Sequence, residues 1–245
     1  MWQFIRLKEL NKAKIMKILI RNLIIILFYL TSVPFWRRLF LTKPRVRVWC
    51  LHEVKNHQVG EFEKKIVYLK KHYNIISPEQ FTGHNLAKDK LNILITFDDG
   101  FTSWLDNVLP ILKKHRLCAI FFIEEKFVKY SSNLTDEGHV LGGHSTYHLK
   151  RLPELSTEEL KLEIQNSVKL DFFAYPFGDK KSFNRVVAEA VKQGGYKYAF
   201  TILPGFNNIK TDSLFLHRDS LDADTPRLIF KLWLKGSYDL IKKIL

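Results

Sequence analysis

The feature that most constrains the fold is a regular alternation of strand-like and helix-like segments that begins at Val46. Continuous apolar runs such as "NILITF" (92–97) and "CAIFFI" (118–123) are typical of buried strands, and segments with helical apolar spacing separate them. Repeated alternation predicts a parallel sheet with helices outside it, either an open α/β sheet or a barrel. With 245 residues, 46% of them hydrophobic, the chain is large enough for one such core.

Three segments of the sequence have patterns that predict a particular helix or strand. Residues 102–115 have the pattern of one helix with a kink at Pro110, because proline lacks the backbone donor that a helix interior uses. Residues 213–217 are expected to form the last strand. A final helix is expected from about Pro226 to the C-terminus.

The net charge of +14 lies mostly at the N-terminus. Residues 1–47 contain eleven Lys or Arg and one acid, Glu9, and therefore carry +10 of the total. A nucleic-acid-binding protein would place its basic stripe on the folded domain, so nucleic acid is not expected as a partner. Basic residues interleaved with bulky apolar ones instead predict a membrane-surface segment over residues 1–44, ahead of one domain over residues 45–245.

The topology of this N-terminal segment stays open. Its longest uncharged run, 22–36, has 15 residues and as a helix would span about 22 Å, less than the ~30 Å hydrocarbon core of a bilayer. An interfacial helix, a spanning helix and a signal peptide are the three interpretations. The interfacial helix is preferred because both flanks are basic and no small-residue cleavage site follows. We therefore expect membrane association, with the cytoplasmic face favoured.

Polar residues gather where the strands are expected to end. His52 follows the first strand, Asp98 and Asp99 follow the strand 92–97, and two further clusters are "GGHSTYH" (142–148) and the turn "YPFG" (175–178). In parallel α/β folds, the loops at the carboxyl ends of the strands carry the chemistry. The two glycines of the third cluster are expected to let the backbone turn tightly before its first histidine.

Two adjacent carboxylates at the end of an apolar strand require a cation, because burying either one unpaired is costly. Two histidines and one carboxylate form a ligand set that leaves water positions open on zinc, iron, cobalt or manganese. His144 and His148 with one aspartate would supply that set, and the other aspartate would stay free as a base that activates water. Cys50 and Cys118 are expected to be buried thiols rather than a disulfide.

Together, "TFDDGF" (96–101), "GGHSTYH" and "FAYPFG" (173–178) resemble the first three motifs of the polysaccharide deacetylase (NodB homology) family, in their order. The resemblance covers about residues 46–235 and implies a distorted (β/α) barrel of about seven parallel strands. It also implies that Asp98 is the catalytic base and that Asp99, His144 and His148 bind one divalent metal ion. Zinc is preferred, and cobalt, nickel or manganese would suit the same ligands.

"CLHEV" (50–54) resembles a leucine–histidine motif that exopolysaccharide-processing members carry on the first strand. The resemblance implies that His52 is the general acid that protonates the leaving amine, which suits an imidazole. The alternative is a histidine that caps a strand end. The backbone N–H of Tyr175 would help the metal to stabilise the tetrahedral oxyanion.

One position departs from the family pattern. Many members carry an arginine two residues before Pro176, where it orients the catalytic aspartate, and this chain has Ala174 there. Arg218 is a candidate for the missing cation, although a surface or structural arginine is the slightly preferred interpretation. Trp104 and Tyr147 are candidate sugar-stacking residues, with packing an equal alternative for both. Pro176 and Arg218 complete the expected substrate-binding set.

The resemblance implies a metal-dependent hydrolase that removes an N-acetyl group from a sugar of a bacterial surface polysaccharide or its lipid-linked precursor. A deformylase, or another hydrolase of non-peptide C–N bonds, could use the same site. A catalytically silent glycan-binding module is the alternative from another class. It is disfavoured because the base, the candidate acid and the three metal ligands are all present.

Overall fold

The structure is a computed structural model that describes residues 23, 44–124, 131–135, 138–165, 170–236 and 239. It separates into two compact units, one formed by residues 43–224 and the other by residues 1–42 with 225–245. The predicted membrane segment 1–44 lies outside the described residues, apart from residues 23 and 44. One domain over residues 45–245 is expected from the sequence, whereas the structure groups residues 225–245 with residues 1–42.

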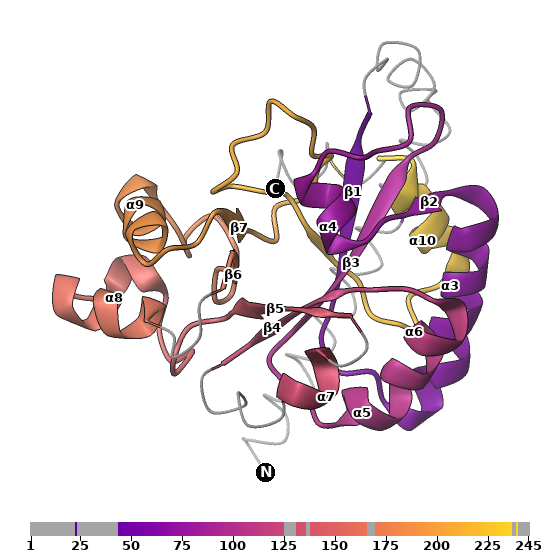
Figure 1. Cartoon of the computed structure of the whole chain (residues 1–245), viewed down its shortest axis with the longest axis horizontal. Coiled ribbons are helices and arrows are strands. Elements are labelled where there is room, and N and C mark those ends of the chain that lie inside the picture. Colours follow the sequence, from indigo (N-terminus) through magenta and orange to yellow (C-terminus); the bar gives the residue numbers. More distant parts are fainter. Residues whose placement is uncertain are drawn as a thin grey trace. The chain divides into compact units, whose positions relative to one another are not determined.

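The larger unit is built on one curled sheet in which all strand pairs are parallel (Figure 1). Seven strands follow one another across it in the order β7-β6-β5-β4-β3-β1-β8, and β2 pairs beside them with β3. The expected distorted (β/α) barrel of about seven parallel strands is confirmed. The strands are β1 (Val46–Leu51), β2 (Asn74–Ile75), β3 (Asn92–Asp98), β4 (Ile120–Ile123), β5 (Val140–Gly143), β6 (Phe172–Ala174), β7 (Tyr198–Phe200) and β8 (Asp219–Ser220).

Residues 213–218, which precede β8 and are called the closing segment below, connect the two edges of this sheet. Leu216 exchanges backbone hydrogen bonds with β7, donating to Ala199 at 2.9 Å and accepting from Thr201 at 2.8 Å. A few residues later, β8 pairs with β1. The expected last strand over 213–217 is therefore shifted: its first part forms only a bridge to β7, and the regular strand begins at Asp219.

Side-chain alternation along the strands separates the inside of the curled sheet from its outside. The inner residues form one buried apolar cluster, to which β1, β3, β4, β6 and β7 all contribute. Thr96 and Asp98 follow Leu94 on the inner face of β3, and Arg218 follows Leu216 on the closing segment. The cluster comprises Val46, Val48, Ile76, Phe81, Leu94, Ile120, Phe122, Phe172, Ala174, Phe200 and Leu216.

Helices cover the outside of the sheet, with α3, α5 and α6 on one side and α8 and α9 beside β6 and β7 (Figure 1). Tyr196 and the apolar residues of η3, α8 and α9 pack with β6 and β7 in a second buried cluster. The helices of this unit are η1 (Asn56–Gln58), α3 (Val59–His72), α4 (Pro78–Thr82), α5 (Ser103–Asn107), α6 (Leu109–His115), α7 (Ser131–Thr135), η3 (Leu152–Glu154), α8 (Thr157–Ile164) and α9 (Arg185–Gln193).

The expected single helix over 102–115 is wrong. The chain forms α5 and α6 instead, and the two helices are separated at Val108. Pro110 lies in the first turn of α6, where its missing N–H would have no intrahelical partner in any case. The proline therefore starts a new helix rather than bending a continuous one.

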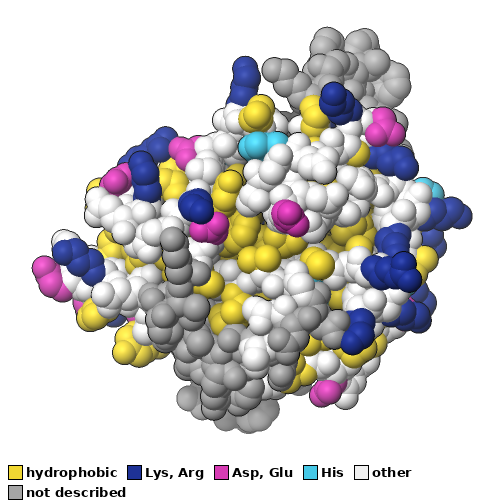
Figure 2. All heavy atoms as spheres, viewed as in Figure 1, with side chains coloured by type: hydrophobic (Ala, Val, Ile, Leu, Met, Phe, Trp, Pro, Cys, Tyr) yellow, Lys and Arg dark blue, Asp and Glu magenta, His cyan; other side chains and the backbone are white. Residues whose placement is uncertain are grey.

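Basic side chains gather at the ends of two neighbouring helices. Figure 2 shows Lys and Arg side chains concentrated at the edge where α3 and α6 lie. The last turn of α3 carries Lys70 and Lys71, and that of α6 carries Lys113 and Lys114. Cations at helix C-termini are stabilised by the helix dipole, which accounts for this cluster without a polyanionic partner.

In the smaller unit, the described helix is α10 (Arg227–Leu234), and Pro226 occupies its N-cap position. The expected helix therefore begins where predicted, but it ends at Leu234 rather than at the C-terminus. No helix in the described part of the chain is long and apolar enough to cross a membrane.

Candidate active site

The four polar clusters at the strand ends meet around one pocket of about 140 Å³. β1 ends before His52, β3 ends at Asp98, β5 ends before His144, and β6 ends before Tyr175. Parallel strands bring their carboxyl ends to the same edge of the sheet, and this topology gathers residues that are far apart in the sequence. The pocket is lined by His52, Asp98, Asp99, His144, His148, Tyr175, Phe177 and Ile202.

Three of these residues could hold a metal ion. Ligand atoms of Asp99, His144 and His148 all lie within 4.8 Å of one another. Asp99 Oδ1 is 3.2 Å from His144 Nε2 and 4.0 Å from His148 Nε2. Two imidazoles and a carboxylate match the ligands that zinc and similar divalent ions use in catalytic sites, so the residues present fit such an ion.

The orientation of His144 supports this interpretation. Its Nδ1 lies 2.9 Å from the carbonyl oxygen of Ala174, so Nδ1 carries the proton and Nε2 is left for a metal. Burial alone would lower the pKa of His144, but the carboxylates of Asp98 and Asp99 raise it above its usual value. Ala174, which replaces the family arginine, thus contributes to the site through its main chain.

Hydrogen bonds to a side chain on α8 hold the loop that carries the two histidines. Glu163 Oε2 accepts hydrogen bonds from the backbone N–H groups of Thr146 and Tyr147, at 3.1 and 3.0 Å. No short-range motif identifies Glu163, because it lies 16 residues after Tyr147 on another element. Its buried carboxylate is satisfied by two main-chain donors, which holds the loop against the helix.

The two glycines before His144 do not form the expected tight turn. Gly142 and Gly143 are the last residues of β5. A Cβ at Gly142 would collide with the ring of Phe122 and lie 3.1 Å from the carbonyl of Phe172, and one at Gly143 would collide with the ring of Tyr196. The glycines are therefore needed because aromatic rings pack directly on this strand.

Among the residues that the structure describes, His148 packs against aromatic rings and makes no hydrogen bond to another element. Its ring hydrogen-bonds to its own main chain, and its centroid lies 4.8 Å from that of His144 and 4.7 Å from that of Phe177. Arg151 lies over the Phe177 ring at 5.1 Å, and its Nη2 donates to Asp179 Oδ2 at 2.9 Å. Arg151 and Asp179 thereby link the histidine loop to the turn after β6.

Asp98 lies next to this candidate ligand set, with its Oδ2 4.0 Å from His144 Nε2, and it pairs with Arg218. Arg218 Nη1 and Nη2 donate to Asp98 Oδ1 and Oδ2 at 2.6 and 2.8 Å, and Arg218 Nε donates to the carbonyl of Thr201 at 3.1 Å. Burial would raise the pKa of Asp98, but the Arg218 guanidinium and His144 lower it to about 2. Asp98 is therefore an ionised carboxylate that faces the pocket.

The preference for a surface or purely structural Arg218 is wrong, because this residue is completely buried and pairs with Asp98. The same geometry contradicts its assignment as a substrate-binding residue. Its donors are taken by Asp98, Thr201 and Thr96, and its guanidinium lies over the ring of Phe122 at 4.9 Å.

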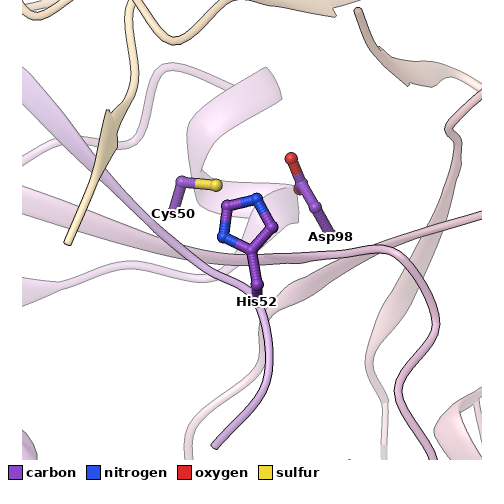
Figure 3. Close-up of side chains that lie close together, drawn as sticks. All are labelled: Cys50, His52 and Asp98. Atoms are coloured by element: carbon purple, nitrogen blue, oxygen red, sulfur yellow. The ribbon is translucent and has the colours of Figure 1, made fainter. Parts of the chain in front are cut away.

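His52 directly follows β1 and lines the same pocket as Asp98. The Trp104 indole Nε1 donates to the His52 carbonyl at 2.8 Å, and Trp104 is only 2% exposed. Trp104 therefore packs in the core and positions the end of β1, which contradicts its assignment as a sugar-stacking residue. Figure 3 shows that the side chains of Cys50, His52 and Asp98 converge.

The role expected of the Tyr175 backbone is contradicted. Its N–H donates to the carbonyl of Phe200 at 3.0 Å, within the pairing of β6 and β7, and is not available to an oxyanion. The Tyr175 hydroxyl donates to the carbonyl of Leu214 at 2.9 Å, and the residue is 1% exposed. Two positions on, Phe177 lines the pocket with a left-handed backbone, and no hydrogen bond of its N–H to another described residue is found.

The remaining expected residues separate into buried and exposed ones. Pro176 is buried and does not line the pocket, so it does not bind substrate directly. Tyr147 is 60% exposed next to the histidines and stays a candidate for sugar stacking.

Both cysteines are free thiols, as expected, although Cys118 is partly exposed rather than buried. Sequence reasoning missed Phe177 and Ile202, and the only signal for Phe177 is its place in the "YPFG" turn.

The fold and the site define an α/β-barrel domain with three candidate metal ligands at the carboxyl ends of its strands. The sequence model for polysaccharide deacetylase matches residues 85–199. Residues 85–199, which include Asp98, Asp99, His144 and His148, therefore match a polysaccharide deacetylase domain.

Curated relatives agree with this assignment. The chain is 33% identical to peptidoglycan-N-acetylmuramic acid deacetylase PdaA of Bacillus subtilis over 115 residues, which is 45% of this chain and 40% of PdaA. It is 28% identical to the Bacillus subtilis protein YxkH over 180 residues, 64% of this chain and 63% of YxkH. The matches thus span less than two thirds of each relative.

Solved structures share the fold. The Streptococcus pyogenes deacetylase PplD superposes with a TM-score of 0.62 at 17% identity, covering 84% of this chain and 99% of PplD. IcaB from Ammonifex degensii superposes with a TM-score of 0.63 at 19% identity, covering 81% of this chain and 97% of IcaB. At this identity the similarity establishes the fold alone.

Proposed function

We propose that the chain is a metal-dependent N-deacetylase that releases acetate from an N-acetylated sugar. One observation carries the proposal: the candidate ligands Asp99, His144 and His148 share a pocket with the ionised Asp98 and with the histidine that directly follows the first strand. This arrangement supplies a base and a candidate acid beside a place for a divalent ion, which metal-assisted amide hydrolysis requires.

Asp99, His144 and His148 would hold the ion, with zinc preferred and cobalt, nickel or manganese able to use the same donors. When bound, such an ion polarises the acyl carbonyl and makes water more acidic. Asp98 then accepts the proton of the attacking water as the new C–O bond forms. Arg218 keeps the Asp98 carboxylate ionised and correctly oriented for this step.

The tetrahedral oxyanion needs a donor, and Tyr175 cannot supply it. The backbone N–H of Phe177 is our candidate, because Phe177 lines the pocket and its N–H has no partner among the described residues. As the C–N bond breaks, His52 donates a proton to the amine nitrogen. The products are acetate and a sugar with a free amine.

The substrate we propose is an N-acetylated sugar of a bacterial surface polysaccharide or of its lipid-linked precursor. PdaA is named for deacetylation of a peptidoglycan sugar, which supports a glycan as the substrate class. The basic and apolar residues 1–44 would hold the protein at a membrane surface, next to lipid-linked sugars. The first-strand histidine is consistent with the exopolysaccharide-processing type.

The test is acetate release from N-acetylated oligosaccharides by the full chain, before and after chelation and after return of zinc, cobalt, nickel or manganese. We expect release that needs the metal and is lost in Asp98→Asn. Formate release from N-formylated sugars in place of acetate would favour a deformylase. A protein that binds glycans but releases neither product, with metal bound, would be a silent binding module.

A further inference from the structure

A second group of potential metal ligands adjoins the first, because Asp98 Oδ2 lies 4.0 Å from His144 Nε2. One ligand atom each from Cys50, His52 and Asp98 all lie within 4.8 Å of one another. Figure 3 shows their side chains converging from two strands. None of the three belongs to the Asp99, His144 and His148 set, so the two groups could each take an ion.

Strand register explains why these three meet. Cys50 and His52 are two residues apart, so their side chains leave the chain on the same side. β1 pairs in parallel with β3, and Cys50 is opposite Thr96 in that register. Asp98 is therefore level with His52, two residues farther along the neighbouring strand. Cys50 and Asp98 lie on paired strands, and His52 is the first residue after β1.

We propose that Cys50, His52 and Asp98 form a second, inhibitory site for a thiophilic divalent ion such as Zn²⁺ or Cd²⁺. Sulfur, imidazole nitrogen and carboxylate oxygen are the three donor types that zinc uses in proteins. The first ligand set offers nitrogen and oxygen alone, whereas the second adds sulfur. Soft ions favour thiolate ligands, so the second site selects them over manganese or magnesium.

The second site binds more weakly than the first for two physical reasons. Arg218 already donates to both oxygens of Asp98, so an incoming ion competes with a buried guanidinium. Cys50 is completely buried, and its thiol proton is displaced when a metal binds. The first site therefore fills first, and the second fills when metal is in excess.

Occupation of this site would inhibit the reaction. It engages Asp98 and His52, which are the base and the acid of the proposed mechanism. This consequence, but not the binding itself, rests on the proposed function. The dependence of activity on zinc is then expected to rise to a maximum near the first equivalent and to fall beyond it.

Cadmium titration of the full chain tests the binding, because a cadmium–thiolate bond has a charge-transfer absorption in the ultraviolet. We expect this absorption to appear after the first equivalent, to be lost in Cys50→Ala and to persist in Cys118→Ala. His52→Ala, which leaves the buried thiol in place, is expected to require a higher cadmium concentration for the same absorption.

The outcomes separate the two proposals. Absence of the absorption at metal excess, or its loss in Cys118→Ala instead of Cys50→Ala, would overturn the second site whether or not the protein is active. The absorption without any deacetylase activity would retain the second site and refute the proposed function. In an active enzyme, zinc inhibition that is unchanged in Cys50→Ala would refute the inhibitory role.

Discussion

Arg218 and Asp98 form a completely buried, bidentate ion pair between the closing segment and β3. The two hydrogen bonds measure 2.6 and 2.8 Å, and the residues are 0% and 2% exposed. Arg218 thus supplies, from the segment before β8, the cation that the resemblance leads us to expect at the position of Ala174.

Removal of Arg218 is expected to destabilise the protein strongly. Arg218→Ala leaves the Asp98 carboxylate buried without a partner, which costs about 3–5 kcal/mol. Arg218→Lys is expected to recover part of this loss, because a lysine keeps the positive charge but cannot form the bidentate hydrogen bonds. Urea unfolding of the three proteins measures the differences.

Arg185 provides a matched control for this experiment. It also pairs with an aspartate at 2.9 Å, Asp212, but its side chain is 81% exposed. Arg185→Ala is therefore expected to change the free energy of unfolding by less than about 1 kcal/mol. Equal stability of Arg218→Ala and the wild type would show that the buried pair is not formed in solution.

Residue patterns were sufficient for the fold and for gathering the polar residues at the strand ends, because both depend on local signals. The choice of Asp99 over Asp98 as the candidate metal ligand came from the family resemblance. Apolar runs mark the strands, and the residues that follow them meet wherever parallel strands end. Arg218, Glu163 and Arg151 were missed or misassigned because their roles depend on contacts between segments distant in the sequence. Sequence patterns carry no information on which N–H of the "YPFG" turn is already used by sheet pairing.

Close packing on β5 makes Gly142 sensitive to substitution. Gly142→Ala would drive a methyl group into the ring of Phe122, and overpacking of this kind costs about 1–3 kcal/mol. Gly60 is the control, because a Cβ there meets no atom within 4 Å and the residue lies in α3. Gly60→Ala is expected to be neutral or stabilising by about 0.5–1 kcal/mol. Thermal unfolding that ranks the two variants in the reverse order would contradict this packing.

Metal binding is expected to stabilise the folded chain through the first ligand set. At a free metal concentration about a hundred times the dissociation constant, the free energy of unfolding rises by about 2.7 kcal/mol. Asp99→Ala should lose most of this increase, whereas Asp89→Ala, at an exposed loop position, should retain it. Thermal unfolding with and without zinc, after chelation, measures the effect. An equal increase in both variants would place the metal elsewhere.

Acid is expected to break the link between Arg151 and Asp179. The hydrogen bond from Arg151 lowers the pKa of Asp179 to about 2, from an ordinary value of 3.8. A lowered pKa means that the pair contributes stability above pH 3.8 and loses it as the pH falls through about 2. Because Asp179 is 42% exposed, solvent screens the pair, and the contribution is less than about 1 kcal/mol. The stability difference between wild type and Asp179→Asn should therefore vanish only in strong acid.

Arg151 is expected to tune the metal affinity without touching the metal. It lies over Phe177, and Phe177 packs against the His148 ring. In the described part of the chain, no other element forms a hydrogen bond that would orient this ring. Residues that orient a metal ligand typically change affinity by about 10–100-fold. Because this contact is packing rather than a hydrogen bond, Arg151→Ala is expected to weaken zinc binding by about tenfold, the lower end of that range.

Competition with a chromophoric chelator measures the zinc affinity, and the visible spectrum of the cobalt-substituted protein reports whether the ligand geometry has changed. Phe177→Leu should act in the same direction as Arg151→Ala, because both remove the packing on His148. Arg185→Ala is again the matched control, since Arg185 also lies over a phenylalanine ring, Phe215 at 4.8 Å, and pairs with an aspartate. If Arg151→Ala and Arg185→Ala bind zinc equally well, His148 is held by its own loop and Arg151 serves stability alone.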